Sequence, residues 1–212
     1  MSNIHETAFV SVTAQVGDEA HIGKGAHIGD HTRVGAHAIV RDGAFVGDHA
    51  HVRADARVGV EAHMSPHTYV GAGALVGINV YIGYGAIVRA GAIVGDGAII
   101  GTKACVGAHT RVGPNAIIGV EAFVGYCAIV GADARVDSHT RIRSVVGLRH
   151  RVCESGVRDN SMLYSVGRHC LTYHEWQNQY KGIATRAKYS EAEARAALAA
   201  IEYLRATGEG RT

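Results

Sequence analysis

The sequence predicts an all-β solenoid, a chain wound into stacked coils, with a short α-helical C-terminal appendage. Every sixth residue from Val10 to Ile142 is Val or Ile, and Met64 is the single exception among these 23 positions. Two residues earlier the side chain is small, with Ala at 18 of the 23, and Gly follows the aliphatic residue at 16. Stacked coils need such regularity because each coil repeats the same side chains at the same places.

The repeating unit reads aliphatic-Gly-x-x-Ala-x, as in Val46-Gly47-Asp48-His49-Ala50-His51. The aliphatic residue and the small residue two positions before it lie on one side of an extended segment, so both point inward and the residue between them points outward. The unit resembles the hexapeptide-repeat superfamily. That resemblance implies a left-handed parallel β-helix of hexapeptide repeats over residues 1–143, although the right-handed crossover preference would predict the opposite hand.

The bulk composition excludes a membrane protein. The chain has 212 residues, a hydrophobic content of 47% and a net charge of +2, without an apolar run long enough to span a bilayer. Its first residues lack the charged and then apolar build of a signal peptide. The four cysteines have no metal-binding or disulfide-framework spacing, which is typical of reduced thiols. We therefore expect a cytoplasmic protein.

The hexad rhythm stops near residue 143. Residues 144–170 keep some apolar positions but are rich in Arg and His, which predicts an irregular last coil or a short hairpin. Residues 171–212 predict a two-helix cap with a capping box at the start of each helix. The first box is Thr172 with Glu175, and its helix is expected to end near Gly182.

The second predicted helix begins with the box of Ser190 and Glu193 and ends near Gly208. We expect the helical tail to cover the end of the solenoid or to clasp a trimer, because an open coil exposes unpaired strand edges. The stretch from Gly167 to Trp176 also resembles tails of uncharacterised phage and prophage proteins, which concerns the source of the chain and not its chemistry.

The outward positions between residues 69 and 129 are nearly all apolar, which predicts a contact surface. The resemblance implies a homotrimer with prisms side by side and ligand sites in the grooves between them. The predicted interface residues are Leu75, Ile87, Ile93, Ile99, Ile117, Phe123 and Ile129, together with Tyr69 and Tyr81.

Histidines at one turn position of successive coils are weak metal candidates. His31, His49 and His67 are 18 residues apart and are expected to stack about 5 Å apart. In the γ-class carbonic anhydrases, which bind zinc or iron between subunits, the ligands lie one and two residues after an aliphatic position. Here the three histidines lie three residues after it. We therefore predict no metal site.

Two functions stay open. On one predicted wall Arg53 and Arg89 follow aliphatic residues and have His51 and Tyr69 nearby, which offers charged hydrogen-bond donors next to aromatic faces and suits a small anionic, nucleotide-like ligand. Tyr81, on a neighbouring wall, is a further ligand-binding candidate. A nucleic-acid partner is disfavoured because acidic turns, such as Asp30 and Asp48, interleave with the basic residues. The sequence favours a rigid homotrimeric binding or scaffold protein of this kind, without a cofactor.

The alternative is a CoA-dependent acyltransferase, the most common activity in the superfamily that the chain resembles. Acetyl-CoA or another acyl-CoA would then be the donor, and His51 or His63 the candidate general base. Such enzymes generally carry a long loop that shelters the base, and no insertion interrupts the hexads from Val10 to Ile142. Whether the protein is an enzyme therefore stays open at this point.

Overall fold

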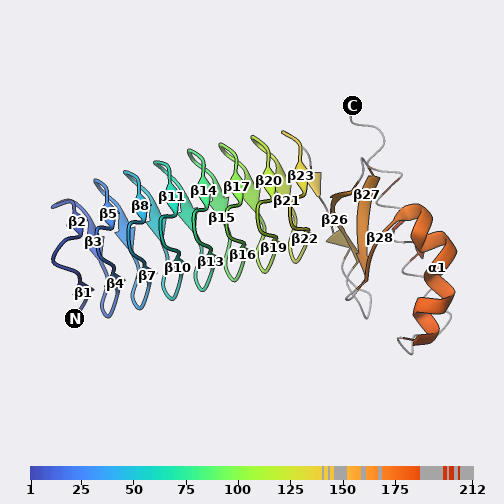
Figure 1. Cartoon of the computed structure of the whole chain (residues 1–212), viewed down its shortest axis with the longest axis horizontal. Helices are drawn as coiled ribbons and strands as arrows, with labels where there is room; N and C mark the ends of the chain where they lie inside the picture. The colour runs from blue at the N-terminus through green and yellow to red at the C-terminus, as the bar shows by residue number, and fades with distance from the viewer. Residues whose placement is uncertain are drawn as a thin grey trace.

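The computed structural model is a left-handed parallel β-helix followed by a small antiparallel sheet and a helix (Figure 1). It describes residues 1–139, 141, 142, 144, 145, 152–158, 161–166, 169–186, 198, 199, 201, 202 and 205. The solenoid has three parallel sheets of eight strands each, and the chain visits the three sheets in turn. The predicted fold class is therefore confirmed, including the absence of any break in the hexad register.

Every strand of the solenoid is two residues long. Sheet A holds β1 (Asn3–Ile4), β4 (His21–Ile22), β7 (Ile39–Val40), β10 (Arg57–Val58), β13 (Leu75–Val76), β16 (Ile93–Val94), β19 (Arg111–Val112) and β22 (Ile129–Val130). Sheet B holds β2 (Phe9–Val10), β5 (His27–Ile28), β8 (Phe45–Val46), β11 (His63–Met64), β14 (Tyr81–Ile82), β17 (Ile99–Ile100), β20 (Ile117–Ile118) and β23 (Arg135–Val136). Sheet C holds β3 (Gln15–Val16), β6 (Arg33–Val34), β9 (His51–Val52), β12 (Tyr69–Val70), β15 (Ile87–Val88), β18 (Cys105–Val106), β21 (Phe123–Val124) and β24 (Arg141–Ile142).

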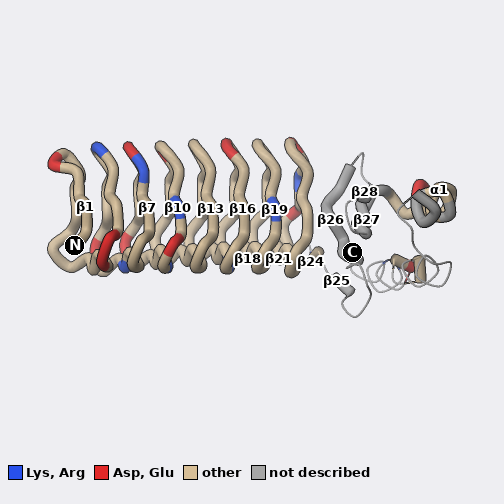
Figure 2. Tube along the Cα trace, turned by 90° about the horizontal axis from the view of Figure 1, so that it is seen from below, with Lys and Arg blue, Asp and Glu red and all other residues tan. Residues whose placement is uncertain are grey.

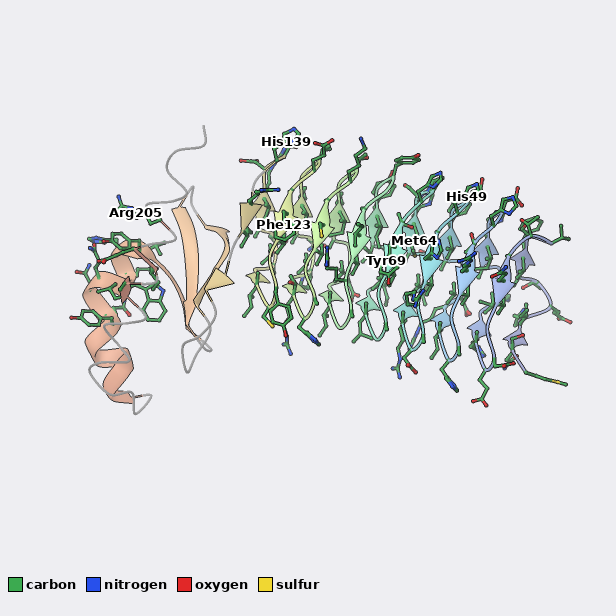
Figure 3. All side chains as sticks on the ribbon, turned by 180° about the vertical axis from the view of Figure 1, so that it is seen from behind. His49, Met64, Tyr69, Phe123, His139 and Arg205 are labelled. Atoms are coloured by element: carbon green, nitrogen blue, oxygen red, sulfur yellow. The ribbon has the colours of Figure 1, made fainter. Side chains whose placement is uncertain are left out.

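The register places residues 18 apart directly above one another, as with Tyr69 and Ile87 or Leu75 and Ile93. From β4 onward the second residue of each solenoid strand is buried in the core, where it packs with the small residue two positions before it, usually Ala or Thr. Met64 takes this place in β11 and is fully buried (Figure 3). The outward columns predicted from the hexad pattern are therefore those of the structure.

The corners between sheets contain a residue in the left-handed conformation once per hexad. Among the described residues, 15 of these are not glycine, with φ between 54 and 61°. From His37 onward the backbone N–H at each such corner donates to a carbonyl of the preceding coil, as from His49 to Asp30 at 2.8 Å, whereas the N–H of His31 donates to the Thr13 hydroxyl at 2.9 Å. The corner side chains are thereby held in columns of their own beside the sheets.

Buried threonines replace Ala in three coils, and one of them lacks a hydrogen-bond partner. The Thr32 and Thr110 hydroxyls donate to the carbonyls of Gly47 and Gly125 at 3.0 and 2.7 Å. The Oγ1 of Thr68 is buried without any partner among the described residues. A buried polar atom that makes no hydrogen bond costs about 1–3 kcal/mol.

We therefore expect Thr68→Val to stabilise the protein by about 1 kcal/mol, because it removes an unsatisfied hydroxyl and keeps the shape of the side chain. Val80 already occupies the equivalent place in another coil. Thr110→Val is the matched control and should destabilise, since it removes the buried hydrogen bond that the Thr110 hydroxyl donates to the Gly125 carbonyl at 2.7 Å. Thermal unfolding followed by circular dichroism checks both, and a loss of stability in Thr68→Val would contradict the expectation.

The C-terminal part begins with a four-stranded antiparallel sheet in the order β25 (Ser144–Val145), β26 (Val152–Arg158), β27 (Ser161–Val166) and β28 (His169–Thr172). Strand β26 lies against β22, β23 and β24, so this sheet covers the last coil, and α1 (Tyr173–Arg186) packs on β27 and β28 (Figure 1). The element in contact with the solenoid end is thus a strand, and α1 packs behind it.

The capping box at the start of α1 is confirmed. The Thr172 N–H donates to the Glu175 carboxylate at 2.8 Å, and the Glu175 N–H donates to the Thr172 hydroxyl at 3.3 Å. The predicted end near Gly182 is wrong, because the helix continues to Arg186. Gly182 is exposed inside the helix, where a glycine costs only about 1 kcal/mol relative to Ala.

Most of the second predicted helix, from Ser190 to Gly208, lies outside the described residues. Those that are described within it are helical, and Ile201 is fully buried. Trp176 of α1 is also buried. No helix in the described part of the chain has both the length and the apolar character needed to cross a membrane.

Candidate functional site

His51 stands on the outer face of sheet C, in a column that changes from basic to apolar along the solenoid. Arg33 precedes it on the neighbouring strand, and Tyr69 and Ile87 follow it. The rings of His51 and Tyr69 are 6.3 Å apart and inclined by 35°. A charged donor, an imidazole, an aromatic face and an aliphatic side chain therefore follow one another at the spacing of the coils.

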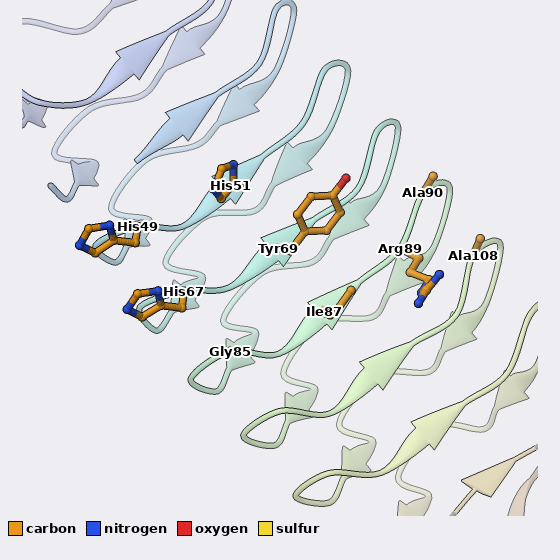
Figure 4. Close-up of a pocket in the computed structure, with 9 residues that line it drawn as sticks. All are labelled: His49, His51, His67, Tyr69, Gly85, Ile87, Arg89, Ala90 and Ala108. Atoms are coloured by element: carbon orange, nitrogen blue, oxygen red, sulfur yellow. The ribbon is translucent and has the colours of Figure 1, made fainter. Parts of the chain in front are cut away.

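A groove of about 680 Å³ crosses sheet C from one corner to the other (Figure 4). It is lined by His49, His51, His67, Tyr69, Gly85, Ile87, Arg89, Ala90 and Ala108. His49, His67 and Gly85 belong to the corner between sheets B and C, which we call the B–C corner. Ala90 and Ala108 belong to the corner between sheets C and A. The groove thus combines imidazole, phenol and guanidinium groups with an apolar floor.

A smaller hollow of about 360 Å³ lies next to this groove, toward the N-terminal coils. His31, Arg33, His49 and His51 line it, so it shares two histidines with the groove. Together the two depressions hold most of the imidazole and guanidinium groups on this wall.

The pKa of His51 is lowered from its ordinary value. Desolvation is the largest cause, and the positive charges of Arg33 and Arg53 add to it, because all three disfavour the imidazolium form. His51 is therefore neutral at pH 7 and able to accept a proton.

Replacing Arg53 with Gln should raise the pKa of His51 toward its ordinary value, because one of the two positive neighbours is lost while the burial remains. The imidazole signals followed by NMR between pH 4 and 8 measure this directly. Arg57→Gln, on sheet A, is the control variant and should leave the pKa of His51 where it is in the wild type, because only Arg33 and Arg53 act on His51 through their charge. An unmoved His51 in Arg53→Gln would contradict the electrostatic explanation.

The structure brings only some of the predicted site residues into one groove. His51, Tyr69 and Arg89 line one groove, whereas Arg53 acts on His51 through its charge without lining it. His63 and Tyr81 lie on sheet B, outside this groove.

On sheet B five rings form a continuous stack, which we call the ring ladder, made of Phe9, His27, Phe45, His63 and Tyr81. Their successive centroid distances are 4.6, 4.8, 4.7 and 5.3 Å. Both faces of the His63 ring are covered, by Phe45 and Tyr81. His63 is therefore a poorer candidate base than His51.

The metal candidates His31, His49 and His67 stack at the B–C corner, with centroid distances of 5.0 and 4.9 Å. The described residues contain no group of three or more His, Cys, Asp or Glu side chains able to hold a metal ion. Sequence reasoning missed that His49 and His67 line the groove. Their position two residues before the outward residues of sheet C could have indicated it.

The apolar interface candidates are exposed or half-exposed in the single chain. Leu75, Ile87, Ile99, Phe123 and Ile129 are each between 36 and 42% exposed, and Ile93 and Ile117 are half-buried. Basic and acidic residues are interleaved along the coils (Figure 2). The apolar columns on the three walls therefore stand out from a surface of mixed charge.

The model of the family described as "Bacterial transferase hexapeptide (six repeats)" matches residues 13–48. Over this segment the chain is similar to the hexapeptide-repeat superfamily. The same repeat continues in the structure through β24, well beyond the matched segment. No curated protein matches the sequence.

The chain is similar to several solved structures at low identity. A mutant perosamine N-acetyltransferase from Caulobacter crescentus, in complex with CoA and GDP-perosamine, is 21% identical over 64% of this chain and 52% of its own, with a TM-score of 0.40. LpxA from Acinetobacter baumannii is 16% identical over 72% and 73%, with a TM-score of 0.46. LpxA from Bacteroides fragilis, a UDP-N-acetylglucosamine acyltransferase, is 17% identical over 68% and 71%, with a TM-score of 0.40. This chain spans about half of the length of the first protein.

Proposed function

We propose that this hexapeptide-repeat protein transfers an acyl group from a coenzyme A thioester to an amine or hydroxyl acceptor in the groove on sheet C. The observation that carries the proposal is a neutral imidazole, His51, placed in a groove that also offers Arg89 and an apolar floor. The sequence alone favours a binder. The match to a family described as a transferase adds weight to the alternative.

The groove offers complementary groups for such a donor. Arg33 and Arg89 carry permanent positive charge for phosphate groups, and guanidinium pairs with phosphate through two parallel hydrogen bonds. The apolar side chains of the groove suit an uncharged part of the donor, and they are those of Ile87, Ala90 and Ala108. Tyr69 supplies an aromatic face and a hydroxyl beside His51.

His51 would act as the general base. Its neutral ring accepts the proton of the acceptor O–H or N–H while that oxygen or nitrogen attacks the thioester carbonyl. The carbon–sulfur bond then breaks, and the leaving thiolate takes the proton from the imidazolium. A base of lowered pKa keeps this role at mildly acidic pH, where an ordinary histidine is already protonated.

The quaternary arrangement belongs to the same proposal. We infer a homotrimer in which the apolar columns pack between subunits, with the grooves of sheet C at the rims of the contacts. Exposed apolar strips of this length are typical of contact surfaces, and cyclic symmetry closes such assemblies.

Release of free thiol from acetyl-CoA and longer acyl-CoAs, over a panel of amine and hydroxyl acceptors, tests the proposal. We expect His51→Gln to lower the rate by about a hundredfold or more, which is the usual contribution of a general base. His63→Gln should retain the rate, because that ring lies in the ring ladder on another wall. Loss of rate in His63→Gln alone would move the base to sheet B.

Binding without turnover is the second candidate function. It is favoured by the uninterrupted solenoid from β1 to β24, which leaves the groove open to water beside the base. No thiol release across the whole panel, with a phosphate-bearing ligand retained by the wild type and lost in Arg89→Ala, would support this second function over acyl transfer.

A further inference from the structure

Three imidazoles form a column on the B–C corner, which we call the histidine ladder. His31, His49 and His67 each have left-handed backbone, with φ of 54, 57 and 60°. This conformation fixes each Cα–Cβ bond in the same direction on successive coils, so the rings stack at 5.0 and 4.9 Å. All three side chains are exposed to solvent. The ladder is therefore a preformed row of proton-binding groups at one edge of the groove.

The charged and titratable groups that face the ladder come from three directions. Asp30 lies nearest, and its carboxylate accepts hydrogen bonds from the Ser11 and Thr13 hydroxyls. The pKa of Asp30 is lowered, chiefly by the Ser11 hydrogen bond, with smaller contributions from Thr13 and the charges of His31 and His49. Asp30 is thus ionised and held by the first coil.

The other facing groups are Asp48, whose Oδ1 accepts the Asp30 N–H at 2.9 Å, and Tyr84, whose ring meets His67 edge-on at 5.2 Å. On the sheet C side, Arg33 and His51 line the same hollow as His31 and His49. His51 has a lowered pKa and stays neutral, so Arg33 is the permanent positive charge of the hollow.

The chemistry of the hollow suits two linked phosphoryl groups. Two rings 5 Å apart can each donate an N–H to a different phosphoryl group, and Arg33 can contact oxygens of both. A hollow of about 360 Å³ admits such a group. Imidazole gains both its second N–H and its positive charge on protonation, so the site improves when the ladder binds protons.

We propose that His31, His49 and Arg33 form a diphosphate-binding subsite that takes up protons from solution when its ligand binds. This subsite rests on the proposed function only for the identity of its natural ligand. That ligand would be an acyl donor or acceptor that carries a diphosphate and extends into the groove. The subsite would give the groove an affinity that rises in mildly acidic conditions, while the neutral His51 remains able to accept a proton.

Calorimetric titration of the full chain with inorganic pyrophosphate, in EDTA, tests the subsite at pH 6 and pH 8. We expect tighter binding at pH 6, by roughly 25-fold for each imidazolium that the bound state requires, since a group with the reference histidine pKa of about 6.5 is mostly protonated at pH 6 and mostly neutral at pH 8. Pyrophosphate itself gains negative charge as the pH rises, so weaker binding at pH 8 must come from the protein. Titration in two buffers of different ionisation enthalpy counts the protons taken up.

His49→Gln is the decisive variant because His49 lies in the middle of the ladder and touches both depressions. It should lose about tenfold in affinity at pH 6, the value of one charged hydrogen bond, and most of the pH dependence. His109→Gln is the control, since His109 has the same left-handed backbone conformation as His49 but lies on another corner, outside both depressions. Thermal melting confirms that both variants fold.

Binding that is equal at both pH values, or that survives intact in His49→Gln, would overturn the subsite. Pyrophosphate binding that is absent in EDTA and appears when a divalent metal ion is added would also overturn the subsite. It would indicate that the histidine ladder binds a metal ion. Proton-linked pyrophosphate binding without any acyl transfer would leave the subsite standing and remove the proposed function. Acyl transfer without pyrophosphate binding would remove the subsite and leave the proposed function standing.

Discussion

Gly113→Ala is expected to destabilise the solenoid by about 3 kcal/mol, the upper end of the usual cost of overpacking. A Cβ at residue 113 would lie 2.5 Å from the backbone nitrogen of Ala132 and 2.6 Å from the carbonyl carbon of Gly131, both on the next coil. These are backbone atoms, which cannot rotate away as a side chain does. The coils would have to separate locally, which weakens the hydrogen bonds between β19 and β22.

Gly131→Ala is the matched control, because Gly131 has the same place in its hexad on the next strand of the same wall. No described atom lies within 4 Å of a Cβ at residue 131, and its φ is not in the left-handed region. Chemical denaturation of both variants measures the difference. Equal loss of stability in the two would show that glycine matters here for backbone conformation and not for the approach of neighbouring coils.

This contrast explains why the fold could be predicted from the sequence. The coils approach so closely that the residue after the aliphatic position is usually Gly. The core is filled almost entirely by Val or Ile together with Ala, so the six-residue period can be seen in the sequence alone. Once the period is known, the register follows, and pairs such as Leu75 and Ile93 are placed correctly.

The candidate site could be predicted only in part. The sequence grouped Arg53 with Arg89 because both follow an aliphatic residue of sheet C, yet only Arg89 lines the groove. The direction of a long side chain depends on its neighbours, which the period does not specify. The lining role of His49 depends on its left-handed corner geometry, and the small sheet from β25 to β28 follows no hexad at all.

Ile99→Asp should dissociate the proposed homotrimer. Ile99 lies on sheet B, whose outward column from Phe9 to Ile117 contains no Lys, Arg, Asp or Glu. Ile99 is 42% exposed in the single chain, and its neighbour Tyr81 is 45% exposed. An aspartate there would be buried without a partner if the column packs between subunits, at a cost of about 3 kcal/mol, which is roughly a hundredfold in association.

Light scattering coupled to size-exclusion chromatography measures the mass of wild type and variant at equal concentration. Val12→Asp is the control, because Val12 is fully exposed at a turn of the first coil, and this variant should keep the mass of the wild type. A wild type that is monomeric at micromolar concentration would remove the trimer from the proposal. A stable trimer in Ile99→Asp would place the contact on sheet A or sheet C. The residue to replace next would be Ile93 for sheet A and Phe123 for sheet C. A contact through sheet C would also enclose the groove with the neighbouring subunit.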